Sequence, residues 1–278
     1  MRNAQRIGRR KWLTRLGGGA LALWAGVDWA RGREGWNVLI GGPRKAEAAQ
    51  QTGTAAQVLP VNIIYASPNL PAPIPVAAFV FVRGREAAIV DTLVANNADK
   101  IAEVLQTAGL GWSNVRHVIL THYHLDHAGS AADVAQLAPQ ATVWVGEADM
   151  AEFNIPRPIY PVNDGDQVFG LRIVATPGHT PGHIAVLDPV GSTLVTGDSV
   201  MNIDGTLTGP FPQFTADMGQ AMQSVAKMGS LGFERALIAH GPIIERGAGA
   251  AFSRLAASGN IVPPPHILAL QHAHCCIA

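Results

Sequence analysis

The stretch LTHYHLDHAGS, Leu120–Ser130, is the most informative part of the chain about its fold and chemistry. It places three histidines and an aspartate within six residues: His122, His124, Asp126 and His127. Neutral imidazole and carboxylate are good ligands for zinc and similar divalent ions. Without a metal, several imidazoles and a carboxylate buried in one loop would be costly to desolvate. The stretch therefore predicts a metal site, and Gly129 behind it leaves room for a tight turn.

More residues of ligand type follow short apolar runs elsewhere in the chain. They are Asp91 after AAIV, His179 and His183 in TPGHTPGH, Asp198 in TGDS, and His240 in IAHGP. Loops at strand ends, held by a rigid sheet, commonly carry functional groups. One loop cannot complete two four-coordinate metal sites alone, so we expect several of these residues to join the histidine cluster.

Strand-like and helix-like runs alternate from Val61 onward. VNIIYA, VAAFVFV, VRHVIL (115–120) and ATVWVG (141–146) are typical of strands, and SPNLPAPIP between the first two is too rich in proline for regular structure. Apolar spacing predicts helices from Ala98 to Gly109, at about 129–138, at 215–231 and at about 246–258. RALIAH is expected to be a strand ending at His240. This alternation predicts a layered α/β fold.

The ordered set THYHLDHAG, TPGHTPGH, TGD and a late His-Gly resembles the metallo-β-lactamase-fold hydrolase superfamily, from about Val61 to Ser258. The resemblance implies a four-layer αββα sandwich with a dinuclear metal site at the edges of its two sheets. It also implies a ligand set: His122, His124 and His179 for the first metal, Asp126, His127 and His240 for the second, and Asp198 between them.

Two further residues have supporting roles under this resemblance. Asp91 matches an early Asp of the family, expected to orient a ligating histidine. This chain departs from the family's usual Asp-x-Gly, having Asp91-Thr92-Leu93 instead. His183 is interpreted as a supporting residue, because three histidines already fill the first site.

The resemblance implies two zinc ions per chain, other divalent metals being an alternative, and a hydrolytic reaction. A metal-bridging hydroxide would be the nucleophile. Asp126 is the predicted catalytic residue, which would orient that hydroxide and pass a proton to the leaving group. Ser199 lacks the Gly-x-Ser-x-Gly context of a serine hydrolase.

The substrate is less constrained than the metal site. A small-molecule ester or lactone fits best, because lactonases of the family share the whole ligand set and the segments SPNLPAPIPVAAF and MNIDGTLTGPFPQF offer apolar pocket walls. Alternatives are an exported metallo-β-lactamase, a phosphotriester or thioester hydrolase, and a mononuclear iron persulfide dioxygenase. Binding of a glutathione thioester would require a basic C-terminal pocket, yet Arg246 and Arg254 are the only Lys or Arg residues in positions 240–278.

Charge is divided unevenly along the chain. Residues 1–45 hold 10 of the 20 Lys and Arg but 2 of the 20 Asp and Glu, so the remaining chain is acidic. An acidic body argues against a nucleic acid partner. We therefore expect a small-molecule substrate; the sequence leaves the oligomeric state open.

The N-terminal residues 6–27, RIGRRKWLTRLGGGALALWAGV, have a basic segment followed by an uncharged one, which is the layout of a signal peptide. Arg9-Arg10 resembles a twin-arginine export signal. We expect a signal peptide at 1–30, a linker at 31–58, the hydrolase domain at 59–260 and a tail at 261–278. Periplasmic or secreted localisation follows from this division, and no stable membrane anchor is expected.

Overall fold

A computed structural model of the chain describes residues 53–66 and 73–259. The predicted signal peptide, most of the predicted linker and the predicted tail lie outside these residues. The first strand begins at Gln57, two residues before the predicted domain start, and the last helix ends at Ser258. In the described ranges, no helix has the length and apolar character needed to cross a membrane.

The first sheet has six strands in sequence order, antiparallel from β1 to β3 and parallel from β3 to β6. They are β1 (Gln57–Tyr65), β2 (Ile74–Arg83), β3 (Glu86–Val90), β4 (Val115–Leu120), β5 (Thr142–Gly146) and β6 (Ile159–Val162). Residues 76–82 of β2 are buried without alternation, because both faces of this sheet are covered.

The second sheet has five strands in the order β13-β10-β9-β8-β7, and only β10 and β13 pair in parallel. They are β7 (Gln167–Val168), β8 (Leu171–Ala175), β9 (Ile184–Asp188), β10 (Thr193–Val195) and β13 (Arg235–Leu237). A separate hairpin, β11 (Met201–Ile203) and β12 (Thr206–Thr208), follows β10.

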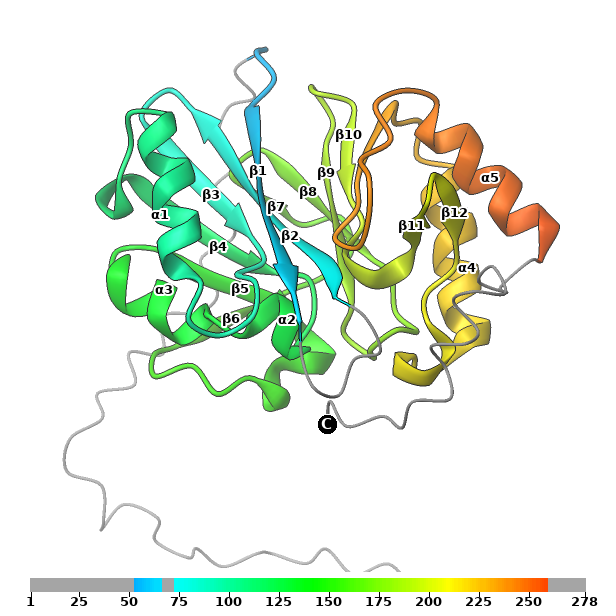
Figure 1. Cartoon of the computed structure of the whole chain (residues 1–278), viewed down its shortest axis with the longest axis horizontal. Coiled ribbons are helices and arrows are strands. Elements are labelled where there is room, and N and C mark those ends of the chain that lie inside the picture. Colours follow the sequence, from blue (N-terminus) through cyan, green and yellow to red (C-terminus); the bar gives the residue numbers. More distant parts are fainter. Residues whose placement is uncertain (1–52, 67–72, 260–278) are drawn as a thin grey trace, which may run out of the picture. The chain divides into compact units, whose positions relative to one another are not determined.

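Figure 1 shows four layers of secondary structure, and three clusters of buried apolar side chains lie between them. The helices α1 (Ala98–Thr107) and α3 (Ala131–Leu137) pack on the outer face of the first sheet through Ile101, Leu105 and Val134. Phe79, Phe81 and Ile119 of the first sheet meet Ile173 and Val186 of the second. The helices α4 (Met218–Gly229) and α5 (Ala248–Ser258) cover the second sheet through Val225 and Phe252. This confirms the predicted αββα sandwich.

Several elements differ from the sequence prediction. The histidine stretch contains a one-turn helix, α2 (Leu125–Ala128), where a loop was expected. The strand predicted to reach His240 ends at Leu237, because its partner β10 ends at Val195, the residue paired with Leu237. The short strands β6, β11 and β12 were not predicted. Short 3-10 turns also occur: η1 (Trp112–Asn114), η2 (Glu147–Glu152), η3 (Gly197–Ser199) and η4 (Pro212–Phe214).

Candidate metal centre

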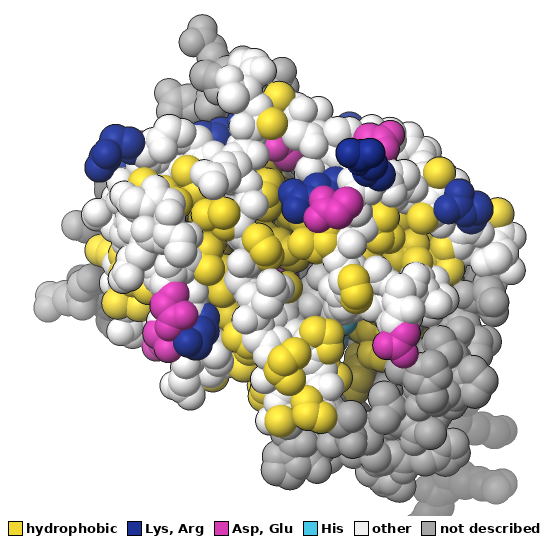
Figure 2. All heavy atoms as spheres, turned by 45° about the horizontal axis from the view of Figure 1, so that its top comes forward, with side chains coloured by type: hydrophobic (Ala, Val, Ile, Leu, Met, Phe, Trp, Pro, Cys, Tyr) yellow, Lys and Arg dark blue, Asp and Glu magenta, His cyan; other side chains and the backbone are white. Residues whose placement is uncertain are grey.

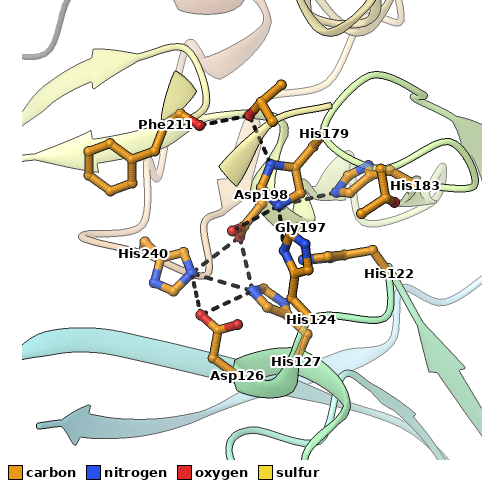
Figure 3. Close-up of polar contacts among 12 residues, drawn as sticks. His122, His124, Asp126, His127, His179, His183, Gly197, Asp198, Phe211 and His240 are labelled. Carbon is orange, nitrogen blue, oxygen red and sulfur yellow. Dashed lines mark hydrogen bonds and ion pairs between the residues drawn. The ribbon is translucent and has the colours of Figure 1, made fainter. Parts of the chain in front are cut away.

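The predicted metal-binding side chains lie together at one end of the two sheets, each on a segment that follows a strand (Figure 3). Three overlapping groups of them offer ligand atoms within 4.8 Å of one another: His122 with His124 and His179, His122 with His127 and Asp198, and Asp126 with His127 and His240. Segments far apart in sequence thus converge as predicted. The structure brings together every residue that the resemblance implied.

The turn after β4 is built for close packing. The carbonyl of His124 accepts hydrogen bonds from the N–H groups of His127 and Ala128, which form the single turn of α2. A Cβ on Gly129 would lie 2.3 Å from the carbonyl oxygen of Leu125 and 2.4 Å from the nitrogen of Ala95. Only glycine fits there, so this residue allows α2 to lie against the loop after β3.

The first group of side chains consists of His122, His124 and His179. Nε2 of His179 lies 2.9 Å from Nδ1 of His124. Nε2 of His122 is buried and has no hydrogen-bond partner among the described residues. Imidazole nitrogens that face one another, and one buried without a partner, are costly unless a cation lies between them.

The second group of side chains consists of Asp126, His127 and His240, and Asp198 lies between the two groups. Oδ1 of Asp198 is 3.0 Å from Nε2 of His127 and 3.3 Å from Nε2 of His240. Its other oxygen, Oδ2, is 3.5 Å from Nε2 of His179. Asp198 therefore turns one oxygen toward each group, and Oδ2 of Asp126 lies 3.3 Å from Nε2 of His240.

Asp91 lies behind the histidines, on the side away from the ligand atoms. Its Oδ2 is 2.9 Å from Nδ1 of His127 and accepts the Thr121 hydroxyl at 2.9 Å, while Oδ1 accepts the Thr121 N–H at 2.7 Å. Thr121 Oγ1 in turn lies 3.0 Å from Nδ1 of His122. Leu93 adopts φ 62°, the left-handed conformation that glycine adopts without strain. Although Leu93 replaces the usual glycine, Asp91 therefore still lies where it can orient His127.

His183 turns its Nε2 toward the backbone N–H of Asp198, at 3.0 Å. Its Nδ1 is 2.8 Å from the hydroxyl of Thr176 and 3.4 Å from that of Ser199. Ser199 is therefore directed toward His183 rather than toward the histidine cluster. Neither His183 nor Ser199 is therefore a ligand candidate, whereas Asp198 is.

Burial keeps the first group of histidines neutral. Burial, together with the neighbouring imidazoles, holds the pKa of His122 well below its ordinary value. Burial also lowers the pKa of His179 to about 4, despite the opposing field of Asp198. Neutral imidazole is the form that binds metal, so this group is ready to act as ligands.

Carboxylates have the opposite effect on the second group. Burial disfavours the charged form of His240, but Asp198 and Asp126 outweigh it and raise the pKa to about 10. The pKa of His127 is likewise raised well above its ordinary value against the effect of burial, first by Asp198. Without a metal, these two imidazolium groups offset the buried carboxylates.

The residues present fit a divalent cation. The cluster has five imidazoles and two carboxylates among its ligand candidates, and no Lys or Arg lies within ion-pair distance of those carboxylates in the described residues. Zinc and similar ions bind such donors in this combination. A buried cluster of this composition is satisfied by a cation that neutralises the carboxylates and fills the space between the nitrogens.

Three polar residues of this region were not singled out by the sequence. Thr121 bridges Asp91 and His122, and Thr215 contacts His179. Asp149 on η2 is buried and accepts hydrogen bonds from Thr180 Oγ1 and the Gly182 N–H, at 2.5 and 2.6 Å. All three act across long sequence separations. Thr121 could have been found because it directly precedes His122 in the histidine stretch. Asp149 and Thr215 lie outside every motif, so no sequence pattern indicated them.

Known proteins share this sequence pattern and fold. The Bacillus subtilis protein YobT is 26% identical over 63% of this chain and 86% of its own length. A hydroxyacylglutathione hydrolase of Parasynechococcus marenigrum is 31% identical over 54% of this chain and 60% of its own. The structure of TTHA1623 in a di-iron-bound form is 26% identical, with a TM-score of 0.54 over 70% of this chain and 98% of that one.

The chain spans less than two thirds of the length of several curated relatives that it matches. The sequence model of the metallo-beta-lactamase superfamily matches residues 71–240, which is more than half of the chain and includes all the ligand candidates. Members of this superfamily are metal-dependent hydrolases, and the His and Asp groups described above fit that chemistry. On this match and this fold, the chain belongs to the metallo-beta-lactamase superfamily.

Proposed function

We propose that this protein is a dinuclear zinc hydrolase that cleaves a small, uncharged ester or lactone. The observation that carries the proposal is the position of Asp198, with one carboxylate oxygen toward His179 and the other toward His127 and His240. A carboxylate shared in this way supports two metal ions rather than one. His122, His124 and His179 would hold the first, and Asp126, His127 and His240 the second, with Asp198 common to both.

Two bound zinc ions would supply hydroxide at neutral pH by lowering the pKa of water and would polarise the ester carbonyl. The chain's own contribution is orientation. Asp91 and Thr121 fix His127 and His122 from behind, and His183 holds the backbone at Asp198. The side chain of Asp126 is 15% exposed, more than that of Asp198 at 6%. We assign Asp126 to orient the attacking oxygen and move its proton to the leaving group.

The distribution of cations supports an uncharged substrate. Arg83 and Arg85 precede β3, and Arg116, Arg172 and Arg235 lie in the first two residues of β4, β8 and β13, at the opposite ends of strands that lead to the cluster. In Figure 2 the Lys and Arg side chains lie mostly in the upper half of the view. A substrate carboxylate would instead meet Asp126 and Asp198.

An apolar residue at the centre supports the same substrate class. Leu125 lies between His124 and Asp126 in sequence, and 62% of it is exposed. A large apolar side chain that is exposed to water beside ligand candidates is suited to contact an apolar part of a substrate. The proposal therefore joins an uncharged carbonyl group to an apolar acyl or alcohol portion.

The alternatives differ in specific features. A β-lactam or a glutathione thioester carries carboxylates, and no Lys or Arg pairs with the centre in the described residues. Ser199 faces His183, which disfavours the arrangement with serine in place of the shared aspartate. A mononuclear iron dioxygenase would leave Asp126, His127 and His240 without a function. A phosphotriester is uncharged and is distinguished by experiment.

The test is hydrolysis of a homoserine lactone, an uncharged aryl ester, a β-lactam, a glutathione thioester and a phosphotriester by the zinc-loaded protein. We expect the ester or the lactone to give the largest kcat/KM, and His124→Ala to abolish it. Preference for the thioester, the β-lactam or the phosphotriester would replace the proposed substrate class. Export through the predicted signal peptide is also part of the proposal, and fractionation of cells that produce the full chain tests it.

A further inference from the structure

His179 makes a contact on the side of its ring that faces away from the metal centre. Its Nδ1 lies 3.1 Å from Oγ1 of Thr215, and the same hydroxyl donates to the carbonyl oxygen of Phe211 at 2.8 Å (Figure 3). Because the hydroxyl proton is used on the carbonyl, the hydroxyl oxygen is left to accept from Nδ1–H of His179. This arrangement fixes the proton on Nδ1 and leaves the Nε2 lone pair directed toward the centre.

The segment that carries Thr215 is attached to the His179 loop by its backbone as well. The N–H of Ala216 donates to the carbonyl of His179 at 3.1 Å, and the N–H of Asp217 donates to the carbonyl of Gly178 at 2.9 Å. A Cβ on Gly178 would lie 2.2 Å from the nitrogen of Ala221 in α4. These contacts leave Thr215 and His179 little freedom to move independently.

An aromatic turn shares the same hydrogen bond. The carbonyl of Phe211 accepts from the Phe214 N–H at 3.1 Å, which closes η4, and also from Thr215. The rings of Phe211 and Phe214 meet edge to face, with centroids 6.5 Å apart. In Figure 3 the Phe211 ring lies on the His240 side of the cluster. One short segment thus presents aromatic surface beside the centre and supports one of its ligand candidates.

We propose that Thr215 is a positioning residue that holds His179 for metal binding and couples the aromatic turn Phe211–Phe214 to the metal centre. The proposal rests on the proposed function only for the assignment of His179 as a ligand. If instead the hydroxyl merely closes the turn, its loss would lower stability and leave metal affinity unchanged. Metal affinity therefore separates the two roles.

The test compares Thr215→Val, which removes the hydroxyl at nearly constant volume, with Thr215→Ser, which keeps it. Zinc affinity is measured by competition with a chelator, and the cobalt-substituted protein is followed by its visible absorption. We expect Thr215→Val to weaken zinc binding about 10- to 100-fold, the usual effect of losing a partner of a ligating histidine. Its cobalt spectrum should also change, and Thr215→Ser should restore affinity and spectrum.

Thr193→Val is the matched control. Thr193 is buried at the start of β10, away from the centre, and its hydroxyl donates to the carbonyl of Gly191 at 2.8 Å. This variant loses a comparable hydroxyl and should bind zinc like the parent chain. Wild-type zinc affinity and an unchanged cobalt spectrum in Thr215→Val would overturn the proposal even if ester hydrolysis were established.

A measurement on the unmodified chain covers the case in which Thr215→Val does not fold. Nitrogen-15 spectra of the zinc-loaded protein should show His179 protonated at Nδ1, and a proton on Nε2 would overturn the proposal. If the protein binds zinc but cleaves no ester or lactone, the proposed function fails while the role of Thr215 stands on the affinity data.

Discussion

The Nε2 atom of His183 accepts a hydrogen bond from the backbone N–H of Asp198 at 3.0 Å. The proton of this ring is therefore on Nδ1, which lies 2.8 Å from the Thr176 hydroxyl, and burial holds the pKa of His183 well below its ordinary value. A Cβ on Gly197 would lie 2.5 Å from Nε2, so glycine is required for this approach. The second histidine of TPGHTPGH thus supports the shared aspartate.

Replacing His183 tests this support. His183→Leu leaves the buried N–H of Asp198 without an acceptor, which should lower the free energy of unfolding by about 1–3 kcal/mol. His183→Gln can supply an amide oxygen to the same N–H and should fall between the parent chain and His183→Leu. Urea unfolding of the metal-free proteins measures the effect. Equal stability of the Leu variant and the parent would show that the bond contributes nothing.

Asp91→Asn tests the support behind His127. Oδ2 of Asp91 now contacts the Thr121 hydroxyl and Nδ1 of His127, and the amide of asparagine would place an NH₂ group at that position. We expect zinc affinity to fall by about 10- to 100-fold. Asp99→Asn removes an exposed carboxylate from α1 and is the control. Unchanged affinity in Asp91→Asn, measured by chelator competition, would exclude the orienting role.

Leu125→Ser tests the apolar contact with the substrate. Burying a leucine side chain against a ligand is worth roughly 1.5–3 kcal/mol, so KM for an apolar ester should rise about tenfold or more. Zinc content should not change, because leucine is not a metal ligand and 62% of this residue is exposed. Leu137→Ser on α3, a residue that is 46% exposed, is the matched control. A KM equal to that of the parent would remove Leu125 from the substrate site.

Proton release on zinc binding follows from the charges of the second group. Without metal, Asp198 and Asp126 raise the pKa of His240 to about 10, so its imidazole is protonated at pH 7. Zinc must displace this proton, because only the neutral ring binds metal. Affinity should therefore rise with pH across the neutral range, and fall as pH falls. Calorimetric titration in two buffers of different ionisation enthalpy counts the protons, and an equal heat in both would contradict the expected release.

The ligand candidates could be predicted because each lies in a short motif directly after an apolar strand. Parallel strands such as β3 and β4 bring their carboxyl ends to one edge, so Asp91 lies beside Thr121 at the start of the histidine stretch. The four-layer fold followed from the same motifs through the family resemblance, and the sandwich of Figure 1 confirms it.

Other features depend on tertiary contacts that no local pattern reveals. Thr215 reaches a histidine 36 positions earlier, and Asp149 holds the loop of Thr180 and Gly182 more than 30 positions later. The α2 turn is only four residues long, too short for an apolar period. β13 ends where its partner strand ends, although the apolar run continues to Ala239.

The central claim is that Asp198 serves two metal ions in a hydrolytic centre. The most direct measurement is the metal content of the purified protein by elemental analysis, taken with ester and lactone hydrolysis by the same sample. The account predicts about two zinc ions per chain, and activity that disappears on removal of zinc and in His124→Ala. One iron per chain, or a metal-free protein that neither binds zinc nor cleaves any substrate of the panel, would contradict it.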